Sequence, residues 1–271
     1  MGEVSAPRGF LIDLDGVLYV GDTPVPGAGD AIRFLEDSGY SYRFVSNTTR
    51  RCRHSVAARL SRMGFFVPED LIFTPPVAAV AYMRKTGHSR FRLLVTGDVR
   101  QDFPPGESLD PAEKVDYVVL GDAGDEITYA NLNGTFRDLM NGAELIALEK
   151  DRYWMAPDGL SLSAGPFVSA LEFATGKTAV LMGKPSEAFF DLALRDMGIR
   201  PDEAVMIGDD IHTDVGGAKN AGMRGVLVKS GKYREDPTAE SSVRPDLIIN
   251  SIADIQKILD TTGEDSSDTP V

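Results

Sequence analysis

The sequence predicts an α/β fold that consists of a parallel-sheet core and an inserted second α/β domain. In both end portions of the chain, short apolar runs alternate with segments of helical periodicity. This alternation is typical of a parallel sheet whose strands are joined by right-handed helical crossovers. The middle portion differs, because its strand and helix patterns are separated by loop-rich stretches. We therefore expect a core built from residues 1–88 and 178–271 and an inserted domain built from residues 89–177.

The first core portion alternates between strand and helix patterns. Residues 9–14 form an apolar run that ends on two aspartates, as a short buried strand does. Residues 29–38 carry apolar side chains at helical spacing and stop at Gly39, a common helix terminator. The same criteria predict a strand at 42–46 and helices at 51–63 and 77–85.

The middle portion contains further apolar runs of strand length and two helical patterns. Residues 102–111 include three prolines and are expected to form a loop, and residues 154–165 are also loop-rich. The regular elements expected here are strands at 92–95, 117–120 and 144–147 and helices at 129–140 and 167–175.

The last core portion returns to simple alternation. Its run at 204–208 is apolar and ends on two further aspartates. The regular elements expected here are strands at 179–182, 204–208, 224–228 and 247–249 and helices at 187–197, 213–221 and 252–259.

The composition is ordinary for a globular enzyme and argues against nucleic acids and anionic membranes as binding partners. The chain has 271 residues and a formal net charge of −13. Nucleic acids and anionic membranes are bound through Lys and Arg, so we expect neither as a partner. No stretch reaches the ~18 apolar residues of a membrane helix, and residues 1–8 lack a signal-peptide pattern. With Cys52 as the single cysteine, no internal disulfide can form. We expect a cytoplasmic protein with a frayed tail at 261–271.

Two carboxylates follow the first predicted strand. Asp13 and Asp15 stand two residues apart, and Gly16 permits a sharp exit from the strand. Ligands of open parallel sheets bind at the carboxyl ends of the strands, so both side chains can point into one crevice. One carboxylate could attack phosphorus, while the other protonates the leaving oxygen and then deprotonates water. Taken alone, the pair fits a turn with a helix-capping Asp equally well.

Polar groups follow two other predicted strands. Ser46 and Asn47 offer a hydroxyl and backbone N–H groups that can hold phosphoryl oxygens, although a helix N-cap explains them too. Lys184 lies between Gly183 and Pro185, which fix the backbone around it. Its charge can offset a phosphoryl group and keep a nucleophile ionised. Taken alone, a surface lysine is the commoner explanation.

The strongest single signal is the acidic segment that follows residues 204–208. Asp209, Asp210 and Asp214 lie close together at this strand end. Carboxylates this close repel one another strongly unless a cation lies among them. Oxygen ligands suit Mg²⁺, which usually takes one or two carboxylates, waters and a substrate phosphate. The sequence therefore predicts a magnesium site here.

These motifs, in this order, resemble the haloacid dehalogenase superfamily of phosphohydrolases over nearly the whole chain. Residues 13–19 resemble its first motif, Ser46 its second, Lys184 its third, and residues 208–210 with Asp214 its fourth. The insert between Ser46 and Lys184 is similar to the type-two α/β cap of the NagD-like phosphatases, which have a Rossmann-like core. Residues 141–233 most resemble the branch that holds the phospholysine phosphohistidine inorganic pyrophosphate phosphatases and their hydrolase-domain-containing relatives.

The resemblance implies a catalytic and metal-binding set. Asp13 would be the nucleophile and a metal ligand. Asp15 would be the acid/base, and its backbone carbonyl would be a second metal ligand. Asp209 would be the third ligand of Mg²⁺, the implied cofactor.

The resemblance also implies supporting roles for the other motif residues. Ser46 and Asn47 would position the phosphate, and Lys184 would stabilise both the phosphate and the nucleophile. Asp210 and Asp214 would lie behind the metal ligands, where Asp214 would orient metal-bound water or Lys184.

The implied function is a Mg²⁺-dependent phosphatase that hydrolyses a small phosphorylated metabolite, ester or anhydride, through an aspartyl phosphate. A phosphotransferase or mutase would use the same intermediate with another acceptor. A receiver-type signalling module shares the sheet, the acidic cluster and the lysine, but it is shorter and lacks an equivalent of Asp15. A protein that only binds phosphate would not need Asp15 either. The sequence does not fix the oligomeric state, and a homodimer stays open.

Overall fold

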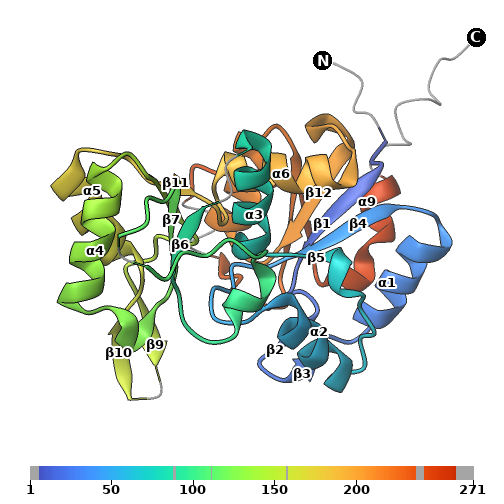
Figure 1. Cartoon of the computed structure of the whole chain (residues 1–271). Helices are drawn as coiled ribbons and strands as arrows, with labels where there is room; N and C mark the ends of the chain where they lie inside the picture. Colours follow the sequence, from blue (N-terminus) through green and yellow to red (C-terminus); the bar gives the residue numbers. More distant parts are fainter. Residues whose placement is uncertain (1–5, 88–89, 111, 157, 236–240, 261–271) are drawn as a thin grey trace, which may run out of the picture. The chain divides into compact units, whose positions relative to one another are not determined.

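A computed structural model describes residues 6–87, 90–110, 112–156, 158–235 and 241–260 (Figure 1). Its internal contacts divide the chain into two compact units. The first unit comprises Met1–Ser46, Ala57–Ile72 and Phe190–Val271, and the second comprises Asn47–Val56 and Phe73–Phe189. The boundaries expected at residues 88/89 and 177/178 remain a prediction. The expected tail at 261–271, residues 1–5 of the N-terminal segment and residues 88–89 lie outside the described residues.

The first unit is built on a six-stranded sheet with the order β14-β13-β12-β1-β4-β5. The central strand β1 pairs in parallel with β12 on one side and with β4 on the other. Parallel pairing continues from β12 to β13 and from β13 to β14, which confirms the predicted parallel sheet. The strands are β1 (Gly9–Asp13), β4 (Ser41–Val45), β5 (Ile72–Phe73), β12 (Ala204–Gly208), β13 (Arg224–Val228) and β14 (Leu247–Ile249).

The two central strands of this sheet are buried along their whole length. Every residue of β1 and of β12 is buried, as expected for parallel strands covered on both faces. This is why each strand appears in the sequence as an uninterrupted apolar run. The α-helices that lie in this unit or enter it are α1 (Ala28–Asp37), α2 (Arg53–Arg62), α6 (Glu187–Met197), α7 (Gly217–Asn220) and α9 (Gln256–Asp260).

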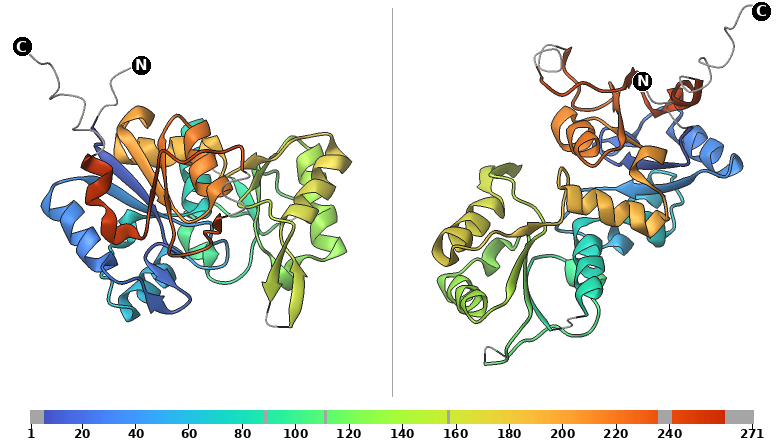
Figure 2. Two further views of the ribbon diagram at one scale, coloured as in Figure 1. Left: turned by 180° about the vertical axis from the view of Figure 1, so that it is seen from behind. Right: turned by 90° about the horizontal axis from the view of Figure 1, so that it is seen from above.

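The second unit has a four-stranded parallel sheet of its own, with the order β11-β8-β7-β6. Helices α4 and α5 pack together beside this sheet (Figure 1 and Figure 2). The core between these layers includes Leu139 and Val168 from the helices and Val118 and Leu145 from the strands. The elements are α3 (Pro75–Thr86), β6 (Phe91–Leu94), β7 (Tyr117–Leu120), α4 (Tyr129–Met140), β8 (Glu144–Ala147), α5 (Gly165–Thr175) and β11 (Val180–Leu181).

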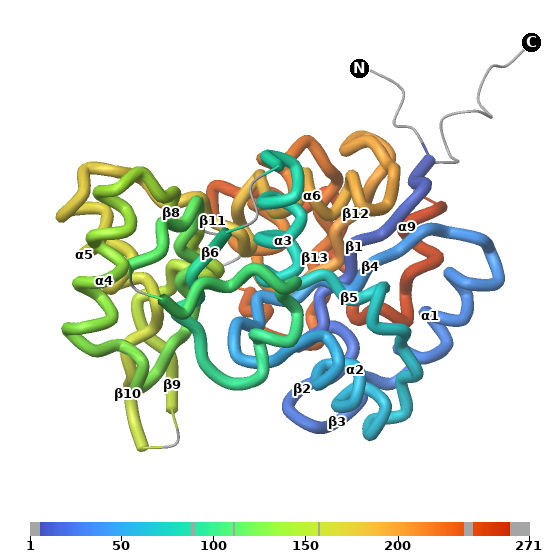
Figure 3. The backbone as a smooth tube through the Cα atoms, viewed as in Figure 1, coloured from blue at the N-terminus to red at the C-terminus, as the bar shows by residue number. Residues whose placement is uncertain are grey.

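One predicted loop of the second unit is a hairpin. Residues 154–165 were expected to form a loop, but β9 (Tyr153–Ala156) and β10 (Gly159–Leu162) pair antiparallel within this region. The turn-type residues next to Gly159 favour a loop when taken alone, yet they also suit the connection of a tight hairpin. The prediction was therefore wrong here, and Figure 3 shows the two strands extending together from the rest of the second unit.

Other departures concern short or irregular elements. The helix expected at 213–221 begins instead with a π-helical segment, η5 (Ile211–Gly216), which continues into α7. The small hairpin of β2 (Tyr19–Val20) and β3 (Thr23–Pro24) was not predicted, because two-residue strands carry too few positions for a periodic signal. In the described parts of the chain, no helix has the length and apolar character needed to cross a membrane.

Candidate active site

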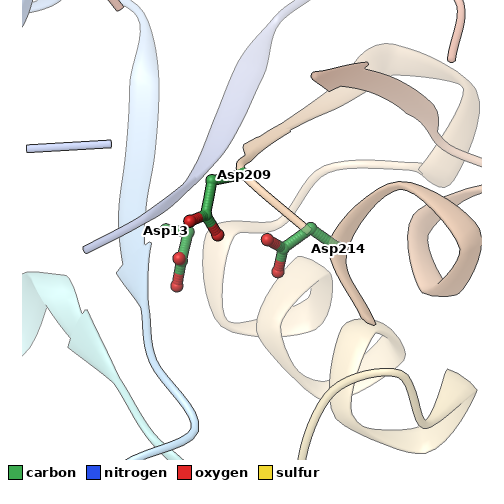
Figure 4. A group of neighbouring side chains, drawn as sticks. All are labelled: Asp13, Asp209 and Asp214. Carbon is green, nitrogen blue, oxygen red and sulfur yellow. The ribbon is translucent and has the colours of Figure 1, made fainter. Parts of the chain in front are cut away.

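Three buried carboxylates converge in the first unit. Each of Asp13, Asp209 and Asp214 offers an oxygen, and these oxygens all lie within 4.8 Å of one another. The residues are only 8%, 3% and 1% exposed, respectively. Figure 4 shows the three side chains pointing toward one another. The family resemblance implies Asp13 and Asp209 as ligands of one metal ion, with Asp214 behind them, and the structure brings these three side chains together.

The sheet register explains why Asp13 and Asp209 meet. Asp13 is the last residue of β1, whose Ile12 is paired with Ile207 of the adjacent parallel strand β12. Asp209 directly follows β12. The carboxyl ends of neighbouring parallel strands lie at one edge of a sheet, so the two side chains emerge side by side.

Asp214 reaches the same point from the π-helical segment η5. Its Oδ2 accepts a hydrogen bond from the backbone N–H of Asp210 at 3.1 Å, which ties the segment back to the strand end. Gly208 leaves the space that this carboxylate occupies, because a Cβ at that position would overlap the Asp214 side chain. A small residue at the end of β12 is therefore a condition for closing the cluster.

The donor set suits a divalent metal ion. Three carboxylates held this closely in a buried place repel one another, and a cation among them would remove that repulsion. Carboxylate oxygens are the donors that hard divalent cations prefer. Among the described residues, this is the one group of three or more His, Cys, Asp or Glu side chains whose ligand atoms lie close enough together to share an ion.

The Asp209 carboxylate is enclosed by two glycines. A Cβ on Gly16 or on Gly231 would overlap its Oδ2. The same oxygen accepts a hydrogen bond from the backbone N–H of Lys232 at 2.8 Å. Ser230 donates a hydrogen bond from Oγ to the Gly16 carbonyl at 2.6 Å, which joins the two loops.

The loop formed by residues 230–232 was not predicted to be part of the site. The loop lies within residues 141–233, for which the sequence indicates a family likeness but no role in the site. Its position after β13 was the available signal, because β13 is another parallel strand whose carboxyl end lies at the same sheet edge.

Lys232 supplies positive charge beside the cluster. Its Nζ lies 3.7 Å from Oδ2 of Asp210. Partial burial alone would lower the pKa of Lys232, but the nearby carboxylates, Asp209 first and then Asp210, Asp13 and Asp214, raise it above its usual range. The ammonium group therefore stays charged at the edge of the cluster.

Asp210 has a structural role in this loop. Its Oδ1 accepts hydrogen bonds from the backbone N–H groups of His212 at 2.9 Å and Thr213 at 3.0 Å, so it caps η5. Burial alone would raise the pKa of Asp210, but these hydrogen bonds and the charge of Lys232 hold it below its usual value. Asp210 is thereby kept ionised next to Asp209.

Asp15 and Ser46 also lie in the first unit, outside the three-carboxylate cluster. Asp15 is exposed, and the backbone around it turns sharply, with the Gly16 N–H donating to the Tyr19 carbonyl at 2.7 Å. Ser46 follows Val45, which is paired with Asp13 across β1 and β4. Both residues therefore leave strands at the same edge as Asp13.

Asn47 and Lys184 meet in the second unit. The Asn47 Nδ2 donates to the Lys184 carbonyl at 2.8 Å, and the Lys184 N–H donates to Asn47 Oδ1, also at 2.8 Å. Lys184 is 7% exposed. A Cβ on Gly183 would lie 2.8 Å from the Leu148 carbonyl oxygen, so glycine permits this close approach. Asn47 thus fixes the backbone that carries the predicted phosphate-binding lysine.

Comparisons with known proteins identify the family of the chain. The model of the family described as haloacid dehalogenase-like hydrolase matches residues 10–103, and a second model, described as HAD-hydrolase-like, matches residues 181–255. The haloacid dehalogenase-like hydrolase domain-containing protein 2 of Bos taurus is 45% identical over 234 residues, which cover 86% of this chain and 88% of that protein. The phospholysine phosphohistidine inorganic pyrophosphate phosphatase of Xenopus laevis is 39% identical over 259 residues, covering 93% and 94%.

Solved structures show the same fold. The p-nitrophenyl phosphatase from Archaeoglobus fulgidus has a TM-score of 0.83 and 28% identity, covering 93% of this chain and 99% of that one. NagD from E. coli K-12 has a TM-score of 0.81 and 23% identity, and the match covers 92% of this chain and 98% of that one. At this identity the match shows a similar fold. The resemblance inferred from the sequence motifs is confirmed: the chain belongs to the haloacid dehalogenase-like hydrolase family and has the fold of its NagD-like phosphatases.

Proposed function

We propose that this phosphatase hydrolyses a small phosphate monoester through an aspartyl phosphate formed on Asp13, with Mg²⁺ as its cofactor. The observation that carries the proposal is the convergence of Asp13, Asp209 and Asp214, with ligand oxygens within 4.8 Å of one another. A buried carboxylate at the end of the central strand can act as a nucleophile when its charge is balanced and its position fixed.

Asp13 and Asp209 would hold the metal through their carboxylates, together with the backbone carbonyl of Asp15. When bound, Mg²⁺ supplies positive charge that stabilises the phosphoryl oxygens in the transition state. Asp214 fixes the distance between η5 and the end of β12 through its hydrogen bond to Asp210. Lys232 donates its backbone N–H to Asp209, which keeps that carboxylate oriented.

The chemical step divides between Asp13 and Asp15. A carboxylate oxygen of Asp13 forms a bond to phosphorus as the bond from phosphorus to the leaving oxygen breaks. Asp15 gives its proton to that oxygen, then takes a proton from the water that attacks the acyl phosphate. Inorganic phosphate leaves, and both carboxyl groups return to their starting states. Asp15 is exposed, so its carboxyl group is accessible to the attacking water.

Ser46, Asn47 and Lys184 would bind the transferred phosphoryl group. The reciprocal hydrogen bonds between Asn47 and the Lys184 backbone support a joint role, since they hold the lysine in one place. An ammonium group in a fixed position offsets phosphoryl charge at little cost in conformational entropy. Residues 89–177 would serve as the cap that selects the leaving group.

The substrate would be a small phosphorylated metabolite. Relatives are named for nitrophenyl phosphate, phospholysine, phosphohistidine and pyrophosphate, and these compounds belong in a first panel. The net charge of −13 disfavours nucleic acid and anionic membranes as partners. A cytoplasmic location is a further part of the proposal.

The test is phosphate release from a panel of phosphorylated metabolites, measured with Mg²⁺ and with EDTA. We expect release that requires Mg²⁺ and is far greater for one or two monoesters than for the rest. Release that persists unchanged in EDTA, or the absence of release from every compound by folded protein, would contradict the proposal.

A further inference from the structure

The second unit contains a cavity of about 340 Å³ that the proposed chemistry does not use. Its size fits a compact ligand group, since ligand pockets of ≈ 300–1,000 Å³ are usual and a cavity of ≈ 150 Å³ holds a benzene ring. The residues that give it chemical character are Arg50, Asp122, Trp154, Ser161, Ser163 and Phe167.

Arg50 is held in a defined orientation at this cavity. Its Nε lies 3.0 Å from Oδ2 of Asp122, and its guanidinium lies over the Trp154 ring, 4.9 Å from the ring centroid. Asp122 is buried and also accepts a hydrogen bond from the Gly124 N–H at 3.2 Å. An arginine fixed through both a carboxylate and an aromatic face is pre-organised, so a ligand that stacks beside it pays little ordering entropy.

The aromatic wall of the cavity belongs to the hairpin. Trp154 on β9 is paired with Ser161 on β10, and both residues line the cavity. The end of the hairpin is anchored, because Ser163 donates from Oγ to Glu149 at 2.5 Å and the Ala164 N–H donates to the same oxygen at 3.0 Å. The indole therefore forms one wall of a site whose base is fixed.

Arg50 lies close along the chain to a predicted phosphate-binding residue. It is three residues after Asn47, and three residues of extended chain span at most about 11 Å. Asn47 is in turn hydrogen-bonded to the Lys184 backbone within the same unit. A group attached to a phosphate at Asn47 and Lys184 is thus within reach of Arg50.

We propose that this cavity binds the leaving group of the substrate, and that this group is a flat ring with hydrogen-bond acceptors at its edge. Trp154 and Phe167 offer aromatic surface for the ring, and the terminal nitrogens of Arg50 offer donors to its edge. This inference rests on the proposed phosphatase function and names its substrate class, an aryl or heteroaryl phosphate monoester.

The charge around the cavity argues against a second anionic group. Among the described residues that line it, the charged ones are Arg50, Asp122 and Asp125. Asp122 already neutralises Arg50, and Asp125 leaves one negative charge in excess. A pyrophosphate, whose leaving group is itself an anionic phosphate, would be repelled where a neutral ring would not.

Binding can be measured without turnover, because Trp154 is the single tryptophan of the chain. The full-length protein with Mg²⁺ would be titrated with benzylphosphonate, a non-hydrolysable aryl analogue, and with methylphosphonate, which lacks the ring. Calorimetry would establish saturation for each. We expect a change in tryptophan emission at saturation with benzylphosphonate and none with methylphosphonate. Absence of benzylphosphonate binding, or saturated binding with unchanged emission, would overturn the site even if phosphate release is observed.

Kinetics separate the site from the chemistry. Stacking on an aromatic side chain accounts for about tenfold to a hundredfold in affinity. Trp154→Ala should therefore lower kcat/KM for phenyl phosphate by that factor. The kcat/KM for glycerol phosphate should stay nearly unchanged. Trp154→Phe should restore most of the loss. Met155→Ala is the matched control, since Met155 is the next residue of β9 and is 71% exposed. Equal losses of kcat/KM for both esters in Trp154→Ala, or the same selective loss in Met155→Ala, would overturn the proposal. The absence of phosphate release from any compound by the wild-type protein would instead contradict the proposed function itself.

Discussion

Replacing Gly16 with alanine should damage the metal site in a way that the same replacement at Gly21 does not. Both glycines have left-handed backbone conformations, with φ of 88° at Gly16 and 61° at Gly21. Nothing lies within 4 Å of a Cβ built on Gly21, whereas a Cβ on Gly16 would overlap the Asp209 carboxylate. The pair therefore separates backbone strain from displacement of a proposed metal ligand.

The magnitudes follow from these surroundings. An alanine in the left-handed region costs about 1–2 kcal/mol, and this is the whole expected loss in Gly21→Ala. In Gly16→Ala, Asp209 cannot move away freely, because Gly231 encloses the same oxygen and Lys232 donates a hydrogen bond to it. Overpacking of a filled site adds about 1–3 kcal/mol, so the total loss should be about 2–5 kcal/mol.

Urea unfolding of both variants would give the free energies, and phosphate release against Mg²⁺ concentration would give the metal requirement. Gly16→Ala should need at least several times more Mg²⁺ for half-maximal rate, while Gly21→Ala should match the wild-type protein. If the two variants show equal stability losses and equal Mg²⁺ dependence, the assigned contact between Gly16 and Asp209 is refuted.

Two further changes test contacts in the second unit. Asn47→Ala removes both hydrogen bonds to the Lys184 backbone. Each bond contributes about 0.5–1.5 kcal/mol, so kcat/KM for a phosphate monoester should fall at least about tenfold. An unchanged kcat/KM would show that the lysine needs no such support. Asp98→Ala removes the acceptor for the Cys52 N–H and the Ser55 hydroxyl. Loss of these two hydrogen bonds should lower the free energy of unfolding at pH 7 by about 1–3 kcal/mol, measured by urea unfolding. Burial alone would raise the pKa of Asp98, but these hydrogen bonds lower it. The stabilisation is therefore present above the usual Asp pKa of ≈ 3.9 and is lost as pH falls through the lower pKa of the folded state. The difference in the free energy of unfolding between wild type and variant should shrink in acid. A difference that stays constant down to about pH 2 would contradict this expectation.

The strand-end aspartates could be predicted because a parallel sheet imposes a simple rule on the sequence. Each buried strand appears as an apolar run, and the polar residue directly after the run must lie at the ligand-binding edge. Asp13 and Asp209 follow two such runs, and the register of β1 and β12 places them side by side. Asp214 could be predicted as part of the same site because it lies only five positions after Asp209 in the sequence.

The parts that were missed depend on contacts between distant segments or on short local patterns. Ser230 and Gly231 carry no charge that marks them as site residues. Their role appears only in the folded protein, where Ser230 donates a hydrogen bond to the Gly16 carbonyl and Gly231 encloses the Asp209 carboxylate. The pairing of Asn47 with the Lys184 backbone spans 137 positions in the sequence. No local pattern encodes such a contact.

The cavity of the second unit was out of reach for the same reason. The sequence pattern around Trp154 indicates a loop and not a hairpin, so it does not predict the orientation of the indole. Arg50 comes from a separate segment, and Asp122 from another. Their convergence is a property of the folded unit and leaves no trace in residue spacing.

The central claim is that the phosphoryl group passes through Asp13, and the most direct test is to trap it there. Asp15→Asn should still accept phosphate from 4-nitrophenyl phosphate, whose leaving group needs no proton, but should hydrolyse the acyl phosphate slowly. After acid quench and borohydride reduction, which converts an acyl phosphate to an alcohol, mass spectrometry of the peptide should show the modification at position 13 after incubation with substrate and Mg²⁺. An early release of about one equivalent of nitrophenol should accompany it. An unmodified position 13, together with normal turnover by Asp13→Asn, would contradict the account.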